Sequence, residues 1–212
     1  MSGLRAYPRF ITIEGGEGAG KSTVLHALRD ALAGDGEVVC TREPGGTPLA
    51  ELIRGLLLDP AHEPASAETE LLLVFAARVQ HVRETLLPAL ERGAWVISDR
   101  FTDSSYAYQG GGRGIAPERI AALEHGYVGI EPALTLLLDL GVAQGRDRAR
   151  ARDAVPDRIE AEQDAFFERV RAGFLQRAAA HPSRVRIIDA ARAADAVAAD
   201  AVRAVQSLRV PA

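Results

Sequence analysis

Short runs of apolar residues alternate with longer amphipathic stretches along this chain. Five of the runs are rich in β-branched or leucine side chains and have the length of buried strands. They are Phe10–Ile13, Val38–Thr41, Trp95–Ser98, Leu134–Asp139 and Arg184–Ile188. The stretches between them repeat apolar residues every three or four positions, which predicts helices. These helices are expected near residues 21–33, 48–58, 68–91, 117–126, 142–151, 159–180 and 193–208.

Alternating strands and helices are typical of βαβ units, in which a parallel sheet is covered by helices on both faces. The sequence therefore predicts an α/β fold with a five-stranded parallel sheet, wound in both directions by right-handed crossovers. The 212 residues suit one domain, residues 1–212. In such a fold, ligands bind at the carboxyl ends of the strands.

The longest predicted helix, residues 68–91, carries an apolar stripe that we expect to face the core. Its members are Leu72, Phe75, Val79, Val82, Leu86 and Leu90. Pro88 should kink the last turns, because proline lacks the backbone N–H of a helix interior. Two polar stretches rich in glycine or arginine, residues 100–114 and 146–158, interrupt the pattern. We expect them to be loops that carry chemistry.

A glycine-rich segment, residues 15–23, follows the first predicted strand and opens the first predicted helix. It reads Gly15, Gly16, Glu17, Gly18, Ala19, Gly20, Lys21, Ser22 and Thr23. This is the phosphate-binding loop pattern G-x-x-x-x-G-K-[ST], or P-loop, in which backbone N–H groups and a helix N-terminus surround phosphates. Lys21 can reach the β- and γ-phosphates of a nucleoside triphosphate, and the Ser22 hydroxyl can bind Mg²⁺.

Composition narrows the choice of partners. The net charge of −4 and the pI near 5.8 argue against a nucleic-acid polymer or an anionic membrane. The single cysteine, Cys40, cannot form an internal disulfide, and the first residues contain no apolar signal-type stretch. We therefore expect a cytoplasmic protein.

Two predicted strands end in an aspartate, and either could support a metal ion. Asp99 follows Trp95–Ser98 and is itself followed by Arg100, which could bind a second phosphate. Asp139 ends the strand that begins at Leu134, but it could simply cap the next helix. The pairing with Arg100 favours Asp99.

Arginines are concentrated in residues 146–158, at Arg146, Arg148, Arg150, Arg152 and Arg158. Alternate residues cannot share one helix face, so one or two of these side chains can reach a ligand while the others stay in solvent. The segment around Pro156 is therefore predicted to be a lid that closes over phosphates.

A tight turn, Arg42–Thr47, follows the second predicted strand at the edge where a ligand is expected. A plain connection between strand and helix would have the same sequence features. The Glu43–Pro44 bond is a candidate for the cis form, because X–Pro bonds are those in which cis costs little.

Several segments resemble the signature sequences of thymidylate kinases, in family order and across nearly the whole chain. They are Thr41–Thr47, Ile97–Phe101 with Ser104–Gln109, Gln109–Gly114 and Asp157–Glu160. The chain is similar to the bacterial branch with an acidic P-loop residue, here Glu17, and catalytic arginines in the lid. Two departures concern lid geometry: Tyr106 is bulkier than expected, and Asp153–Pro156 gives the lid its own shape.

The resemblance implies a nucleoside monophosphate kinase fold, a homodimer, and transfer of phosphate from ATP to thymidine 5′-monophosphate (dTMP) with Mg²⁺. It implies catalytic roles for Lys21, Glu17 and a lid arginine; we favour Arg152, with Arg148 and Arg158 as rivals. Ser22 and Asp99 would support the metal, the latter through water. The implied acceptor-binding residues are Arg54, Phe75, Arg78, Arg100, Ser105, Tyr108 and Gln109.

Individual roles within that set also follow from the resemblance. Arg54 and Arg100 would hold the acceptor phosphate, Phe75 would stack on thymine, and Arg78 would donate to a ring carbonyl. Ser105 would contact the base, and Tyr108 would crowd the sugar 2′ position. Two alternatives remain open: a kinase for another nucleoside monophosphate, and a nucleotide-gated switch that binds ATP without transferring phosphate.

Overall fold

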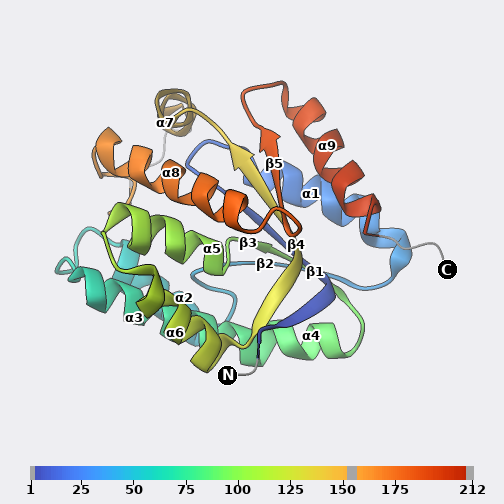
Figure 1. Ribbon diagram of the computed structural model, residues 1–212, viewed down its shortest axis with the longest axis horizontal. Helices are drawn as coiled ribbons and strands as arrows, with labels where there is room; N and C mark the ends of the chain where they lie inside the picture. Colours follow the sequence, from blue (N-terminus) through green and yellow to red (C-terminus); the bar gives the residue numbers. More distant parts are fainter. Residues whose placement is uncertain (1–2, 152–156, 209–212) are drawn as a thin grey trace.

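The five predicted strands form one parallel sheet in the order β2-β3-β1-β4-β5 (Figure 1). The structure is a computed structural model that describes residues 3–151 and 157–208. The strands are β1 (Arg5–Gly15), β2 (Val38–Arg42), β3 (Trp95–Asp99), β4 (Ile130–Asp139) and β5 (Val185–Asp189). Ile13 of β1 pairs with Asp99 of β3, and Gly15 pairs with Leu138 of β4, so the carboxyl ends of these strands meet at one edge.

Helices cover both faces of the sheet, as predicted. The α-helices are α1 (Lys21–Leu32), α2 (Pro48–Leu58), α3 (Ala67–His81), α4 (Leu87–Glu91), α5 (Thr102–Ser105), α6 (Pro117–Leu123), α7 (Val142–Arg150), α8 (Asp164–Ala180) and α9 (Ala194–Gln206). A 3₁₀ turn, η1 (Ala33–Asp35), and three π-helical stretches, η2 (Val82–Leu86), η3 (Tyr106–Gly112) and η4 (Glu124–Val128), complete the described elements. Their bounds agree with the predicted ranges to within a few residues, apart from the differences given below.

Each face of the sheet has its own core. Ile11 and Ile13 of β1 point toward α1 and α9, where they pack with Val24 and Val197. Phe10 lies on the opposite face, in a cluster built from α3, η2, α4 and α6. A third cluster joins α8 to η3 and β4. Figure 1 shows the same division, with α1 and α9 on one side and α3, α4, α6 and α8 on the other. Within the described residues, no helix has both the length and the apolarity needed to cross a bilayer.

Helix starts follow ordinary capping chemistry. The Thr47 side chain accepts from the N–H of Ala50 at 3.2 Å at the start of α2, and Pro48 occupies the first turn. Ser66 caps α3 by accepting from Thr69. These caps explain why the predicted starts of both helices lie at or next to the observed ones.

The prediction of a loop over residues 100–114 is wrong, because α5 and η3 fill most of it. Its glycines allow close helix packing rather than a turn. A Cβ on Gly111 would lie 2.7 Å from the carbonyl oxygen of Arg169, and one on Gly112 would lie 2.5 Å from the Phe166 ring. Helix α8 therefore approaches η3 at a distance that a larger side chain would prevent.

Three helical details also differ from prediction. Leu72 was expected in the core stripe of the long helix but is 58% exposed, and Val79 is only half-buried. The α pattern changes to π just before Pro88, at η2. Helix α8 begins at Asp164 rather than near 159, because Asp157 accepts from the N–H groups of Ile159 and Glu160 and makes a turn there.

Candidate active site

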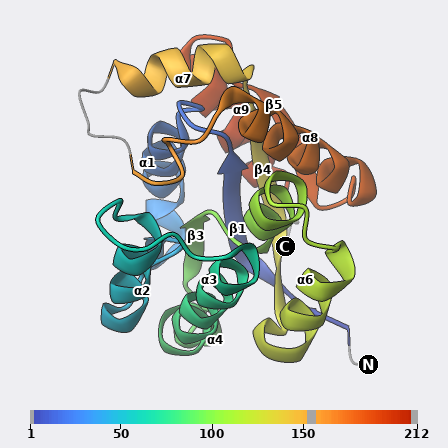
Figure 2. The ribbon, with the colours of Figure 1, turned by 90° about the vertical axis from the view of Figure 1, so that its left-hand side faces the viewer.

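A cavity of about 550 Å³ lies at the carboxyl ends of β1, β2 and β3, where the topology predicts a ligand site. In Figure 2, α7 lies above the end of β1, and α2 and α3 lie below it. The predicted residues that the cavity brings together are Glu17, Gly18, Ala19, Gly20, Lys21, Ser22, Thr23, Arg54, Arg78, Asp99, Arg100, Ser105, Tyr108, Gln109 and Arg148. Gly15 and Gly16 line a smaller neighbouring pocket.

Lys21 is the first residue of α1, and its side chain folds back over the P-loop. Its Nζ donates to the carbonyl oxygen of Gly16 at 3.1 Å and lies 3.4 Å from that of Gly15. Burial, together with the charge of Arg100, lowers the pKa of Lys21 to about 8. Burial also raises the pKa of Glu17 to about 7, and a hydrogen bond that protonated Glu17 donates to the Glu160 carboxylate adds to the shift. The charges of both groups therefore depend on what occupies the cavity.

Helix α7 packs directly against the P-loop through two glycines. Gly18 has a φ of +67°, and a Cβ on it would lie 2.2 Å from the carbonyl oxygen of Gly145. A Cβ on Gly145 would in turn lie 2.5 Å from the carbonyl oxygen of Glu17. The first part of the predicted lid thus begins as a helix that is seated on the phosphate-binding loop.

Asp99 and its rival Asp139 have different surroundings. Asp139 accepts two hydrogen bonds from Arg171, at 2.8 and 2.9 Å, so its carboxylate is occupied. Asp99 faces the cavity, and its Oδ1 is buried without a hydrogen-bond partner. Within residues 3–151 and 157–208, no cluster of three or more His, Cys, Asp or Glu side chains could hold a metal ion by itself. A cation here would need ligands from a bound phosphate chain.

Arg100 is fixed at the junction of the P-loop and the rest of the cavity. Its backbone has a φ of +73°, which is rare for a residue with a side chain. Its N–H donates to Ile13, and its guanidinium donates to the carbonyl of Gly15 at 3.1 Å and to the Tyr108 hydroxyl at 3.1 Å. Ser104 accepts a further bond from the same guanidinium at 3.2 Å. This cation is therefore directed before any ligand binds.

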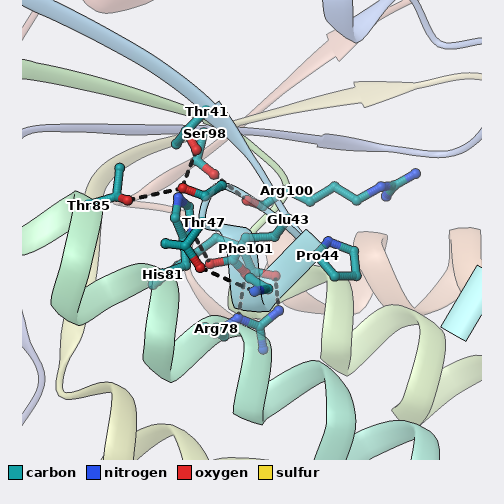
Figure 3. A network of polar contacts seen from close by, with 12 residues as sticks. Thr41, Glu43, Pro44, Thr47, Arg78, His81, Thr85, Ser98, Arg100 and Phe101 are labelled. Atoms are coloured by element: carbon teal, nitrogen blue, oxygen red, sulfur yellow. Dashed lines mark hydrogen bonds and ion pairs between the residues drawn. The ribbon is translucent and has the colours of Figure 1, made fainter. Parts of the chain in front are cut away.

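Arg78 is buried, 2% exposed, and each of its nitrogens has a partner (Figure 3). Nε donates to Glu43 at 2.6 Å, and the two terminal nitrogens donate to the Ser105 hydroxyl at 2.8 Å and to the carbonyl of Phe101 at 3.0 Å. Glu43 precedes Pro44 through a cis bond, the candidate form named from the sequence. Arg78 and Ser105 thus reach the cavity as one hydrogen-bonded pair.

Phe75 does not reach the cavity. It is 3% exposed in the core cluster of α3, and its ring lies 4.7 Å below the guanidinium carbon of Arg78. Among the described residues, the apolar side chain of α3 that lines the cavity is Val74, one turn before Arg78. A residue four positions earlier lies on the same helix face as Arg78, and this spacing could have identified Val74 from the sequence.

Gln109 of η3 belongs to a second group of polar side chains, which forms around Glu70 near the start of α3. Its amide donates to Glu70 at 2.9 Å, and Arg113 donates to the same carboxylate at 3.1 Å. Arg113 also pairs with Glu162, in the turn that precedes α8. Arg54 of α2 donates to the carbonyl of Pro44 at 3.0 Å.

The three candidate lid arginines differ in what the structure gives them. Arg152 lies outside the described residues. Arg148 lines the cavity and donates to the carbonyls of Ala190 and Ala191. Arg158 is not among the described cavity-lining residues; it donates to the carbonyls of Asp59, His62 and Glu63, after α2. Arg158 is therefore engaged in holding that loop.

Comparisons with known proteins agree with this geometry. The sequence profile of the family described as Thymidylate kinase matches residues 13–201. The chain belongs to the thymidylate kinase family. The chain is 59% identical over 194 residues to a thymidylate kinase of Pseudomonas fluorescens, covering 91% of this chain and 90% of that one. It is 55% identical over 202 residues to one from Ectopseudomonas mendocina, covering 94% and 93%.

A solved structure of this family has the same fold. The crystal structure of thymidylate kinase from Ehrlichia chaffeensis superposes with a TM-score of 0.76 at 33% identity, over 95% of this chain and 99% of that one. The chain is thus an enzyme of the thymidylate kinase family with the P-loop fold of nucleoside monophosphate kinases. ATP is the co-substrate that such a kinase uses.

Sequence reasoning missed several buried acids around the site of this kinase, among them Glu14 and Asp103. Glu14 precedes the P-loop and accepts from the N–H of Phe101 at 2.7 Å and from Ser104 at 2.6 Å. Burial raises the pKa of Glu14 to about 8. Asp103 of α5 forms ion pairs with Arg177 and Arg184. An acid at the end of a buried strand was a usable signal for Glu14, whereas the partners of Asp103 are distant in sequence.

Proposed function

We propose that the protein transfers the γ-phosphoryl group of ATP to the 5′-phosphate of dTMP, giving ADP and dTDP for dTTP synthesis. The observation that carries this proposal is the cavity itself, which joins a P-loop to a pocket containing Arg78, Ser105 and Gln109. A phosphate acceptor has a second pKa near ~6 and is largely deprotonated at pH 7, so the reaction needs no general base. The demand is to bring two polyanions together in line.

On the donor side, the P-loop backbone would hold the β-phosphate, and Lys21 would contact the β- and γ-phosphates. Mg²⁺ fits this side, since Asp99 presents a buried oxygen without a partner and Ser22 lines the same cavity. Ser22 would bind the cation directly and Asp99 through water; the ion would neutralise phosphate charge. Burial raises the pKa of Glu17 to about 7, so the protonation state of Glu17 would respond to the charges of the bound triphosphate and its cation.

On the acceptor side, Arg100 and Arg54 would bind the dTMP phosphate. Arg78 and Ser105 would donate to the base, with Gln109 nearby, and Val74 would supply the apolar surface against the ring. Tyr108, whose hydroxyl accepts from Arg100, would stand beside the sugar. The role proposed from resemblance for Phe75 becomes indirect, since its ring supports Arg78 from beneath.

A lid arginine would stabilise charge on the transferring phosphoryl group. Arg158 already binds three backbone carbonyls, which favours Arg152 or Arg148 for this role. We keep Arg152 as the first candidate, because Arg148 is partly engaged with the carbonyls after β5.

We further propose a cytoplasmic homodimer. Helix α2 exposes Leu49, Leu52 and Leu56 at spacings of three and four, and Leu72 of α3 is also exposed. A stripe of this kind suits an isologous contact between two copies. Light scattering at micromolar concentration should give twice the chain mass, and Leu52→Glu should shift the protein toward monomer. A monomeric mass for the unmodified protein would contradict the dimer. The lone Cys40 is consistent with a reducing compartment.

A coupled assay for ADP tests the reaction. Purified protein with ATP and Mg²⁺ should turn over with dTMP and much more slowly with dCMP, AMP or GMP. Comparable rates with a different monophosphate would favour a kinase for that nucleotide. No turnover with any acceptor, together with tight ATP binding, would favour the nucleotide-gated switch.

A further inference from the structure

His81 is buried next to the acceptor pocket, and none of the roles above uses it. It is 0% exposed and lies three residues after Arg78, on the same face of α3. Its Nδ1 lies 2.9 Å from Oε1 of Glu43, and its Nε2 lies 2.7 Å from the hydroxyl of Thr41. Figure 3 shows Glu43 between His81 and Arg78.

We propose that His81 is a positioning residue for the acceptor nucleotide, which it serves by orienting Glu43 and, through Glu43, Arg78. The inference rests on the proposed function, in which Arg78 contacts the base of dTMP. The two oxygens of Glu43 are divided between the helix residues: Oε2 accepts from Arg78 at 2.6 Å, and Oε1 accepts from His81. Without the His81 donor, one buried oxygen is left unpaired and the carboxylate is free to rotate.

The charge balance supports an ionised Glu43 in this arrangement. Burial alone would raise the pKa of Glu43, but Arg78 and His81 outweigh it, so the pKa is lowered. An ionised carboxylate only accepts hydrogen bonds, so Nδ1 of His81 must carry a proton. Nε2 can then accept from the Thr41 hydroxyl, which fixes the ring from its other side.

The same ring also supports the phosphate end of the acceptor pocket. Gly46 has a φ of +85°, and a Cβ on it would lie 2.5 Å from Cδ2 and Nε2 of His81. The ring therefore lies flush against the Pro44–Gly46 turn, and the carbonyl of Pro44 accepts from Arg54 at 3.0 Å. Thr85 secures the turn further by donating to the carbonyl of Gly46 at 3.1 Å. The His81 side chain thus contacts both Glu43, which holds Arg78, and the Pro44–Gly46 turn, which holds Arg54.

Two amide variants separate the Glu43 contact from the Thr41 contact. The side-chain nitrogen of Asn can take the place of Nδ1, so His81→Asn retains a donor for Glu43. The longer Gln places its amide nearer Nε2, so His81→Gln retains the Thr41 contact and loses the Glu43 contact. His81→Leu removes both at similar volume.

The experiment measures steady-state kinetics and melting temperature for the three variants beside the unmodified protein. His81→Leu should raise KM for dTMP by roughly tenfold, as expected when a buried acceptor loses its donor, with kcat and KM for ATP within about twofold. His81→Asn should restore most of the dTMP affinity, and His81→Gln should not.

Three outcomes would overturn the inference. They are an unchanged KM for dTMP in His81→Leu, equal losses for ATP and dTMP that follow the melting temperature, and rescue by Gln rather than Asn. If the unmodified protein does not phosphorylate dTMP, the proposed function fails instead, and the two failures are thereby distinguished.

Discussion

The acceptor and donor sides of the cavity differ in how their charged groups are satisfied. On the acceptor side, Arg78 has a protein partner for each nitrogen, and Glu43 accepts at both oxygens. On the donor side, Asp99 has an oxygen with no partner, while burial raises the pKa of Glu17 to about 7 and lowers that of Lys21 to about 8. On the acceptor side, the charged groups have their hydrogen-bond partners within the protein. On the donor side, we expect the bound ligands to supply the missing partners.

The difference matches what each side has to recognise. A base is recognised by donors held at fixed angles, so the ordering cost is met during folding and not during binding. A triphosphate with its cation brings several charges at once, and groups with shifted pKa values can adjust to them. Substitutions on the donor side should therefore lower kcat, whereas substitutions on the acceptor side should weaken dTMP binding or the fold.

The largest effect is expected for the lid. Arg152→Ala should lower kcat by ~10³-fold with little change in ATP affinity, because an arginine on the transferring phosphoryl group acts in the transition state. Arg152→Lys should not restore the rate, since lysine lacks the planar fork of donors. Arg158→Ala is the matched control: it should loosen residues 59–63 and leave kcat nearly unchanged. Full kcat in Arg152→Ala with a loss in Arg148→Ala would move the role to Arg148.

Lys21→Ala should lower kcat by ~10²-fold or more, as for other groups that stabilise shifting charge. Circular dichroism and the melting temperature should stay close to those of the unmodified protein, because the hydrogen bonds of the Lys21 side chain within the described residues go to two carbonyls of its own loop. Near-normal turnover in the folded variant would show that the loop does not act on phosphate.

The ion pairs of Asp103, in the same helix α5 as Ser105, should lose their stabilising effect in acid. Burial alone would raise the pKa of Asp103, but Arg184 and Arg177 lower it to about 2. Stability from this depressed pKa is fully present above the ordinary value near 3.8 and is lost as pH falls through about 2. The contribution at neutral pH is about 2 kcal/mol. Urea unfolding at pH 7 and at pH 2 should show a loss that is larger by this amount in the unmodified protein than in Asp103→Asn.

Charges remote from both sides should matter least. Arg119 and Glu68 join α6 to α3 across 3.4 Å, but both side chains are more than half exposed. Arg119→Ala should change the free energy of unfolding by less than about 1 kcal/mol and leave both KM values unchanged. A larger loss in either measurement would mean that the α6–α3 surface contributes to the acceptor side.

The donor side was the more predictable of the two from sequence. A P-loop is contiguous, so the strand before it, its glycines and Lys21 are all visible within one short window. The acceptor pocket is assembled from α2, α3, α5 and η3, and which side chains line it depends on the rotation of each helix about its axis. That is why Val74, which was not singled out from the sequence, lines the cavity, whereas Phe75 is buried in the core.

Other features that the sequence does not reveal also arise from contacts between distant segments. The glycines of η3 suggested a loop because their purpose, contact with α8, is not visible locally. Arg158 looked like its neighbours in a run of arginines, and only the fold gives it three carbonyls after α2. His81 belongs to no motif, and Glu14 gives only the signal of an acid at the end of a strand; the importance of both arises from their buried hydrogen-bond partners.

Lys21 is the only lysine in the sequence. With its pKa lowered to about 8, a substantial fraction of this amine is uncharged in mildly alkaline buffer, unlike an ordinary lysine. An amine-directed acylating or aldehyde reagent therefore has one side-chain target in the whole protein, apart from the chain's α-amino group. Peptide mapping would separate labelling of Lys21 from labelling of the α-amino group. ATP bound in the cavity should block labelling of Lys21 alone. Labelling of Lys21 would therefore report whether the donor site is occupied. The same amine is a natural attachment point for covalent inhibitors of that site.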